Sequence, residues 1–296
     1  MKLGKKCLSC LVGQIENCLE VMNIKEEKTL PILQDAMTVI SKSDTSKSPP
    51  LIGREAYTRI CELTGIVDPF ERIKKYSNDM AMRLLPFARS LTQKGDDPIL
   101  SSLKISITGN IIDYGAPGES NEDEIKQLLI ESVETHIDNI TFNDFLHDID
   151  NSEKILFLGD NSGEIVFDKL FIENLPSDKI IFSVRGKPII NDSTLIDAEY
   201  TGLNKLVKVI DTGDNTPGID FSRCSNHFLD EFKTADMIIL KGQGNLETLI
   251  DENISGYIKK ETPLYFLLKV KCYFVAELLE KNIGDIVFIK KGGINP

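Results

Sequence analysis

The stretch "KILFLGDNSGEIVFDKL", residues 154–170, changes character in its middle. A short apolar run ends at the turn Gly-Asp-Asn-Ser-Gly-Glu, residues 159–164, and apolar residues then recur at helical spacing. A short apolar run bounded by turn-forming residues is typical of a buried strand, and the pattern after it predicts a helix. The turn between them can be a tight connection with a helix N-cap, or a site for a cation and an anion. Both interpretations stay open at this point.

The same alternation continues through the second half of the chain. Five more short β-rich runs follow, at 179–186, 205–213, 235–242, 263–270 and 285–292, and helical patterns lie near 163–174, 192–203, 219–233 and 245–259. Strands that alternate with helices predict βαβ units on a mostly parallel sheet. The predicted fold class is therefore α/β, with a three-layer α/β/α core.

The first hundred residues have a different pattern, with apolar residues at helical spacing. Helices are predicted over about 8–22, 26–41, 52–64 and 70–94, with a loop at 41–50 and a helix start at Asp68-Pro69. We therefore predict two parts: a helical N-terminal region at 1–100 and an α/β domain at 101–296, which carries the metal and phosphate site argued below.

Composition excludes several classes of protein. The formal charge of −12 disfavours a nucleic-acid or anionic-membrane surface, because both need a basic face. No stretch reaches the roughly 20 apolar residues of a membrane-spanning helix, and polar residues interrupt the N-terminus too early for a signal peptide. A cytoplasmic location is expected, in which the six cysteines would be thiols or metal ligands. The oligomeric state is not predicted.

Glycine and polar side chains gather where the predicted strands end. Four loops combine glycine with charged or amide residues, at 159–164, 185–192, 211–215 and 241–245. One such loop is ordinary turn chemistry. Ligands of open parallel sheets, however, bind outside the carboxyl ends of the strands, so four such loops in succession favour a ligand site.

The residue types in these loops suit phosphate chemistry with a hard divalent cation. Asp and Asn oxygens are ligands that Mg²⁺ or Mn²⁺ prefers. The backbone amides of Ser162, Gly163 and Glu164 would open a helix and favour an anion by roughly 0.3–1 kcal/mol. Phosphate monoester hydrolysis is among the slowest uncatalysed reactions, so a metal and a lysine must contribute. Lys241, at the end of its strand, could reach a phosphoryl oxygen as a point charge.

A nucleotide or S-adenosylmethionine site is an alternative. "LKGQGNLETL", residues 240–249, begins like the dinucleotide fingerprint, but Glu247 or Thr248 stands where the third glycine belongs. Folds that bind S-adenosylmethionine use a similar glycine-rich first loop, and Asp160 with Glu164 keeps that alternative open.

The ordered set of motifs resembles a known family. It comprises "GDNSGE", "RGKPIINDST", "DTGDNTPG" and "KGQGN", with "ITGNIIDYG" at 107–115 and an N-terminal C-x-x-C. These resemble the DUF89 family of metal-dependent damage-control phosphatases, in its stand-alone archaeal and bacterial branch, over nearly the whole chain. The resemblance implies a helical region on an α/β core. It also implies hydrolysis of small phosphorylated metabolites, such as sugar phosphates or damaged cofactor-related phosphates, with Mn²⁺, Co²⁺, Ni²⁺ or Mg²⁺.

The resemblance also assigns residues. By motif match the metal ligands are Asp160, Asn161 and Asp192; Asn110 and Asp113, after Gly109, line the same pocket; and Lys241, Gly242 and Asn245 contact the phosphate. The implied mechanism uses the metal to polarise a phosphoryl oxygen and to lower the pKa of a water. Covalent attack by Asp160 is the alternative, and the lack of an Asp-x-Asp spacing favours water. Some eukaryotic members have been proposed as carboxyl methyltransferases, so that reaction also stays open.

Three cysteines offer a third hypothesis. Cys7 and Cys10 share one face of a predicted helix, and Cys272, near the start of a later helix, could supply another thiol. A zinc site needs about four ligands, and neither a second C-x-x-C nor a suitably spaced histidine is present. A non-enzymatic metal- or thiol-binding module is therefore the remaining alternative.

Overall fold

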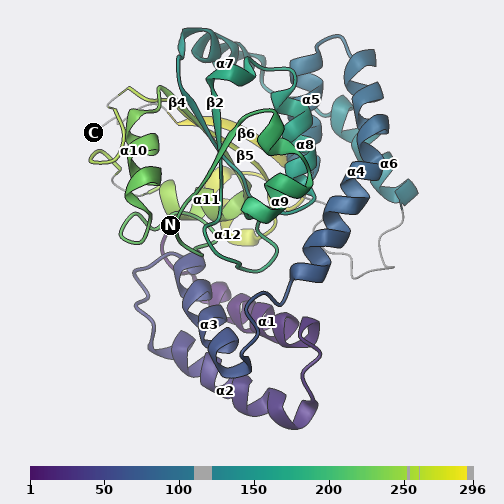
Figure 1. Ribbon diagram of the computed structural model, residues 1–296. Coiled ribbons are helices and arrows are strands. Elements are labelled where there is room, and N and C mark those ends of the chain that lie inside the picture. Colours follow the sequence, from purple (N-terminus) through teal and green to yellow (C-terminus); the bar gives the residue numbers. More distant parts are fainter. Residues whose placement is uncertain (110–121, 252–253, 260, 292–296) are drawn as a thin grey trace.

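The structure, a computed structural model, describes residues 1–109, 122–251, 254–259 and 261–291. Helices precede the first strand over half of the chain (Figure 1). They are α1 (Lys5–Val21), α2 (Glu26–Lys42), α3 (Pro49–Thr64), α4 (Glu71–Lys94), α5 (Pro98–Thr108), α6 (Glu122–Glu134) and α7 (Asn139–Asn151). Strands then alternate with α8 (Glu164–Ile172), α9 (Leu195–Tyr200), α10 (Asn226–Thr234), α11 (Gly242–Leu249), α12 (Tyr273–Leu279) and the short 3₁₀ helices η2 (Ser177–Lys179) and η3 (Leu203–Lys205).

One six-stranded sheet forms the centre of the fold. Its strands are β1 (Ile155–Leu158), β2 (Ile180–Val184), β3 (Lys208–Asp211), β4 (Met237–Lys241), β5 (Leu264–Lys269) and β6 (Ile286–Lys291). Their order is β3-β2-β1-β4-β5-β6, and only the β5–β6 pair is antiparallel. The predicted mostly parallel sheet and α/β class are thus confirmed. The strand order reverses direction between β1 and β4, where ligands bind in folds of this type.

Both faces of the sheet are apolar because the central strands carry hydrophobic residues at nearly every position. In β1, Ile155 and Phe157 join the core cluster that includes α4, α5, α7 and α8, whereas Leu156 and Leu158 join the cluster that includes α10, α11 and α12. Side chains alternate across a strand, so a continuous apolar run supplies a core on each side. This produces the three layers visible in Figure 1.

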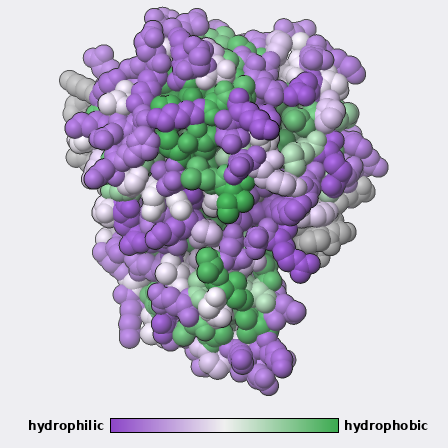
Figure 2. All heavy atoms as spheres, in the orientation of Figure 1, coloured by the Kyte–Doolittle hydropathy of each residue, from purple (hydrophilic) through white to green (hydrophobic). Residues whose placement is uncertain are grey.

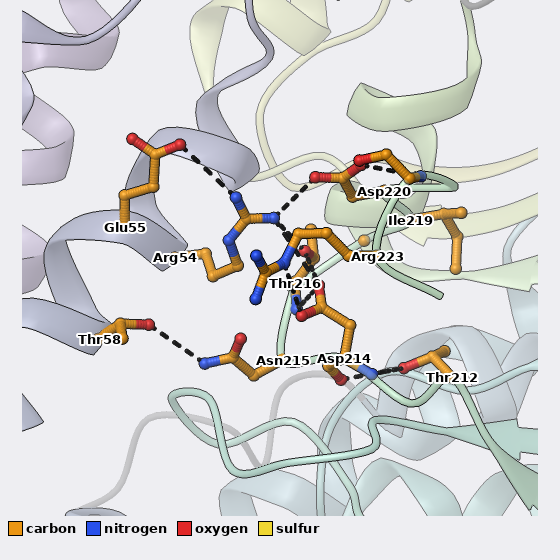
Figure 3. A network of polar contacts seen from close by, with 12 residues as sticks. Arg54, Glu55, Thr58, Thr212, Asp214, Asn215, Thr216, Ile219, Asp220 and Arg223 are labelled. Carbon is orange, nitrogen blue, oxygen red and sulfur yellow. Dashed lines mark hydrogen bonds and ion pairs between the residues drawn. The ribbon is translucent and has the colours of Figure 1, made fainter. Parts of the chain in front are cut away.

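The first three helices form a unit with a core of its own, at the bottom of Figure 1. Buried Ile189, from the loop after β2, also belongs to this core and fastens the unit to the sheet. A second attachment is polar. Buried Arg54 of α3 donates to Asp220 Oδ2 and Thr216 Oγ1, each at 2.8 Å, and pairs with Asp214 at 3.7 Å (Figure 3). The unit α1–α3 is therefore anchored beside the loops at the carboxyl ends of the strands.

Several predicted boundaries shift. The predicted loop at 41–50 is shorter, because α2 continues to Lys42 and α3 begins at Pro49, where proline fits the first helical turn. Helix α4 begins at Glu71, later than the predicted start at Asp68-Pro69; Asp68 instead accepts a hydrogen bond from the Phe70 amide. The sequence-based division at residue 100 stays a prediction, although helices continue to Asn151.

The face shown in Figure 2 is covered mainly by hydrophilic side chains, with hydrophobic patches over both the α1–α3 unit and the sheet part.

Each helix in the described ranges is too short or too polar to cross a lipid bilayer.

Candidate active site

A cleft of about 920 Å³ lies between the α1–α3 unit and the carboxyl ends of the strands. Its lining comes from α1 and α3 on one side, and on the other from the loops after β1, β2, β3 and β5 and from α11 and α12. The loop after β1 and the start of α11, which follows β4, flank the point where strand order reverses. The cleft thus occupies the place in the fold where ligands are expected.

Asp160, Asn161 and Asp192 meet at the floor of this cleft. All three are buried and line it. The two loops that carry them are joined by an isolated bridge between Asn161 and Asp192, and by a 2.8 Å hydrogen bond from the Ser193 amide to the Asp160 carbonyl. The structure therefore brings together the three residues that the motifs predicted as metal ligands.

The Asn161 side chain is oriented by its neighbours. Its Nδ2 donates to Asp160 Oδ2 at 2.9 Å and to Glu164 Oε2 at 3.3 Å. Because both amide protons point toward carboxylates, the Oδ1 atom is directed away from them. A carboxamide oxygen held in this way is a suitable ligand for a hard cation.

Arg185 holds the second carboxylate in place. It is 2% exposed, donates from Nε to Asp192 Oδ2 at 2.6 Å, and has Nη2 3.6 Å from Asp160 Oδ1. Its Nη1 and Nη2 atoms also donate to Asn245 Oδ1, at 3.3 and 3.2 Å. One guanidinium therefore fixes both carboxylates and is itself fixed by α11.

The electrostatics of the pair favour a cation. Burial raises the pKa of Asp160 well above its usual range, and the neighbouring charges of Asp192 and Glu164 raise it further, against the effect of Arg185. Burial likewise raises the pKa of Asp192. Two buried carboxylates and a carboxamide oxygen are the hard donors that Mg²⁺ or Mn²⁺ takes, so this residue set fits such an ion.

Gly242 makes room for the Asp160 carboxylate. A Cβ atom at residue 242 would lie 1.9 Å from Asp160 Oδ2, and the residue has φ +77, which glycine adopts without strain. The first residue of α11 thus forms a cradle for Asp160.

Replacing Gly242 with alanine is expected to lower the free energy of unfolding by about 1–3 kcal/mol. The added methyl would collide with the Asp160 carboxylate and would be held at an unfavourable φ. Urea denaturation measures the change. Gly13→Ala is the matched control, because no atom lies within 4 Å of the added Cβ. Equal stability of both variants and the parent would contradict the claim that Gly242 makes room for the Asp160 carboxylate.

Lys241 lies beneath the cleft and does not face it. Its side chain is fully buried; its Nζ pairs with Glu164 Oε1 at 2.7 Å and with Asp168 Oδ1, and donates to Ser106 Oγ at 2.8 Å. Burial acts to lower its pKa, but Asp168 and Glu164 outweigh burial and raise it. Through Glu164, this ammonium group supports the orientation of Asn161.

Comparison with known proteins gives the family. A profile of the damage-control phosphatase ARMT1-like domain matches residues 3–287. The chain belongs to this family.

Relatives in archaea match the ARMT1-like chain over almost its full length. An uncharacterized protein of Methanocaldococcus jannaschii is 33% identical over 98% of this chain and 96% of its own. A damage-control phosphatase of Archaeoglobus fulgidus is 29% identical over 97% and 98%, and one of Pyrococcus horikoshii is 30% identical over 98% of both. The crystal structure of a DUF89 family protein from P. horikoshii matches with TM-score 0.86 and 28% identity over 98% of this chain and 99% of that one. The resemblance to DUF89 proteins is confirmed.

The predicted phosphate contacts differ from the observed geometry. The Ser162 amide donates to the Asn191 carbonyl at 2.9 Å, and the Gly163 amide donates to Asn78 Oδ1 at 2.7 Å, so two of the three predicted anion donors are already engaged. Glu164 is buried and accepts a hydrogen bond from Asn161, and Asn245 is buried and accepts one from Arg185. Gly242 leaves room for the Asp160 carboxylate. Asn110 and Asp113 lie outside the described residues.

Sequence reasoning missed Lys271. It follows β5, is exposed, and lines the cleft; its charge lowers the pKa of Asp160, against the larger effects of burial and Asp192. It stands, like Asp160 and Asn161, just beyond the carboxyl end of a parallel strand, so the rule that identified the four loops also applied to this fifth one.

The three cysteines predicted as a possible module also line the cleft. Burial raises the pKa of the Cys7 and Cys10 thiols, and the neighbouring Cys272 raises both further. Within the part of the chain that the structure describes, no three His, Cys, Asp or Glu side chains are arranged to hold a metal ion. The thiol-metal alternative stays a prediction, as does the cation site of Asp160, which uses two carboxylates and a carboxamide.

Proposed function

We propose that this protein is a metal-dependent phosphatase that hydrolyses small phosphorylated metabolites. The observation that carries the proposal is the meeting of Asp160, Asn161 and Asp192 on the floor of a cleft at the reversal of strand order. Relatives over nearly the whole chain are named damage-control phosphatases, and the family carries the same description.

Asp160, Asn161 and Asp192 would hold the cation, for which Mn²⁺, Co²⁺, Ni²⁺ and Mg²⁺ are the candidates. When bound, such an ion supplies Lewis acidity toward a phosphoryl oxygen and lowers the pKa of water. The protein's own contribution is positional. Arg185 and Gly242 fix the two carboxylates, and Glu164 fixes the carboxamide, so the donors need little rearrangement.

Water is the proposed nucleophile rather than Asp160. Both oxygens of the Asp160 carboxylate face protein groups: Oδ2 accepts from Asn161, and Oδ1 lies 3.6 Å from Arg185. Burial also raises the pKa of Asp160. A carboxylate oriented by these two neighbours is less free to turn toward a phosphoryl group than a water molecule is.

Lys271 is the proposed phosphate contact, in place of Lys241. Lys271 is exposed on the cleft wall beside Asp160, whereas Lys241 is enclosed by Glu164 and Asp168. A lysine exposed on the wall of a cleft can meet an incoming phosphate as a point charge.

Replacing Lys271 with methionine is expected to lower kcat/KM for p-nitrophenyl phosphate about 10- to 100-fold, the value of one charge-assisted hydrogen bond. The affinity for Mn²⁺ should stay equal or rise, because a cation next to Asp160 is removed. Steady-state kinetics and calorimetry measure both quantities. Lys281→Met, exposed and outside the cleft lining, is the control.

The same assay tests the proposed function. Phosphate release that requires an added divalent cation supports it. Absence of release with all four cations, together with saturable binding of S-adenosylmethionine in a calorimeter, would instead support the methyltransferase alternative. A cytoplasmic location, and a small metabolite rather than nucleic acid or membrane as partner, stay predictions from composition.

A further inference from the structure

Away from its floor the cleft is lined mostly by hydrophobic residues, with a minority of polar ones such as Lys6, Gln14 and Gln243. The lining contains the side chains of hydrophobic residues from α1, α3, α12 and the loops after β2 and β3, among them Leu11, Ile15, Pro49, Ile190, Pro217 and Phe274. Its volume of about 920 Å³ is at the upper end of the range of small-molecule sites, roughly 300–1,000 Å³. The space beyond the proposed phosphate position is therefore both large and hydrophobic.

Ile190 is an independent indication of function. Its φ of +35 is a conformation that a β-branched residue rarely adopts, and it lies two residues before Asp192 on the cleft wall. Glycine or asparagine would make this turn without strain. Residues with backbone strain of this kind cluster at ligand sites, which suggests that the hydrophobic side chain itself is required here.

The opposite wall presents aromatic rings that are not buried in the core. Tyr273 and Phe274, the first two residues of α12, are 67% and 37% exposed and both line the cleft. Lys6 of α1 places its Nζ 4.2 Å from the Tyr273 ring centroid, and a Cβ on Gly4 would lie 3.0 Å from the Phe274 ring. The Tyr273 ring thus contacts Lys6 of α1, and the Phe274 ring lies next to Gly4, which precedes that helix.

Building on the proposed phosphatase function, we propose that the substrate is a phosphate monoester whose organic group is apolar or aromatic. The phosphate would sit at Asp160, Asn161 and Asp192, and the organic group would lie between Ile190 and Phe274. A sugar hydroxyl that lies against the hydrophobic side chains of these walls would lose water without a new partner, at a cost of about 1–3 kcal/mol on mutational scales. Apolar groups would gain from the same burial.

A matched series of alkyl phosphates tests this, because all its members have alkoxide leaving groups of similar quality. We expect kcat/KM for 2-phenylethyl phosphate and n-hexyl phosphate, with Mn²⁺ present, to exceed that for glycerol 3-phosphate and glucose 6-phosphate at least about tenfold, as one buried hydroxyl would predict. Equal or faster hydrolysis of the polar pair would overturn the inference alone. No hydrolysis of any ester, p-nitrophenyl phosphate included, would overturn the proposed function and the inference with it.

Two variants locate the pocket. Phe274→Ala is expected to reduce the preference for 2-phenylethyl phosphate over glycerol 3-phosphate about threefold to tenfold, the usual contribution of one aromatic contact. Leu278→Ala, on the same helix, similarly exposed and outside the cleft lining, should leave the ratio unchanged. Ile190→Gly should reduce the preference as Phe274→Ala does. A ratio that is unchanged in both cleft variants would overturn the proposed position of the organic group.

Discussion

Replacing Asp192 with asparagine is expected to lower metal-dependent kcat/KM for p-nitrophenyl phosphate at least about 1,000-fold, which corresponds to ~4 kcal/mol of transition-state stabilisation. The substitution removes one of the two negative charges of the proposed cation site while keeping the shape of the side chain. Asparagine can still accept a hydrogen bond from Arg185, so the buried guanidinium keeps a partner. Steady-state kinetics over a range of Mn²⁺ concentrations measure the loss.

Asp211→Asn is the matched control for this prediction. Asp211 ends β3, two strands from β1 in the same sheet, and its Oδ1 accepts from the Gly213 amide outside the cleft lining. Its replacement should leave turnover nearly unchanged. Full metal-dependent turnover in Asp192→Asn, with an intact fold by circular dichroism, would remove Asp192 from the site.

Replacing Lys241 with methionine is expected to destabilise the protein by about 3–5 kcal/mol, the usual cost of removing one partner from a buried ion pair. The variant leaves the carboxylates of Glu164 and Asp168 at 1% exposure or less without their cation. Asp168 already resists ionisation, since burial raises its pKa to about 6. Guanidinium denaturation gives the free energy of unfolding.

Two further variants show whether the loss of stability in Lys241→Met comes from the buried ion pair. Lys259→Met removes an exposed ion pair with Asp236 and should cost less than about 1 kcal/mol. Lys241→Met combined with Asp168→Leu should recover part of the lost stability, because one uncompensated carboxylate disappears. A Lys241→Met protein with full stability but weak phosphate binding would restore the role that the motif match assigned to Lys241.

The sheet could be predicted from the sequence because its signal is local. Every strand is a short apolar run between turn-forming residues, and all six predicted runs contain a strand of the sheet. The meeting of Asp160 and Asp192 could also be predicted, since both follow parallel strands that end at one edge. What the motifs could not supply was the direction of each side chain.

Lys241 illustrates this limit. In β4, Met237 and Ile239 point into the core cluster that includes α5 and α8, and alternation places Lys241 on the same face, next to Ser106 and Asp168. Alternation along the strand therefore predicts that Lys241 points away from α11. The motif alone does not show that Asp168, on α8, lies on that face and pairs with Lys241.

The cleft itself depends on contacts between distant residues. Arg54 reaches Asp220 across 166 positions of sequence, and Ile189 enters the core of the α1–α3 unit. These contacts place α1 and its cysteines opposite Asp160, which no local pattern indicates. Lys271 was missed for a simpler reason: its loop lacks the glycine and amide residues by which the other loops were recognised.

Anomalous diffraction from crystals soaked in Mn²⁺ tests the central claim most directly. The account predicts one strong peak about 2.0–2.3 Å from side-chain oxygens of Asp160, Asn161 and Asp192. A peak beside Cys7, Cys10 and Cys272, with none between the two aspartates, would contradict it.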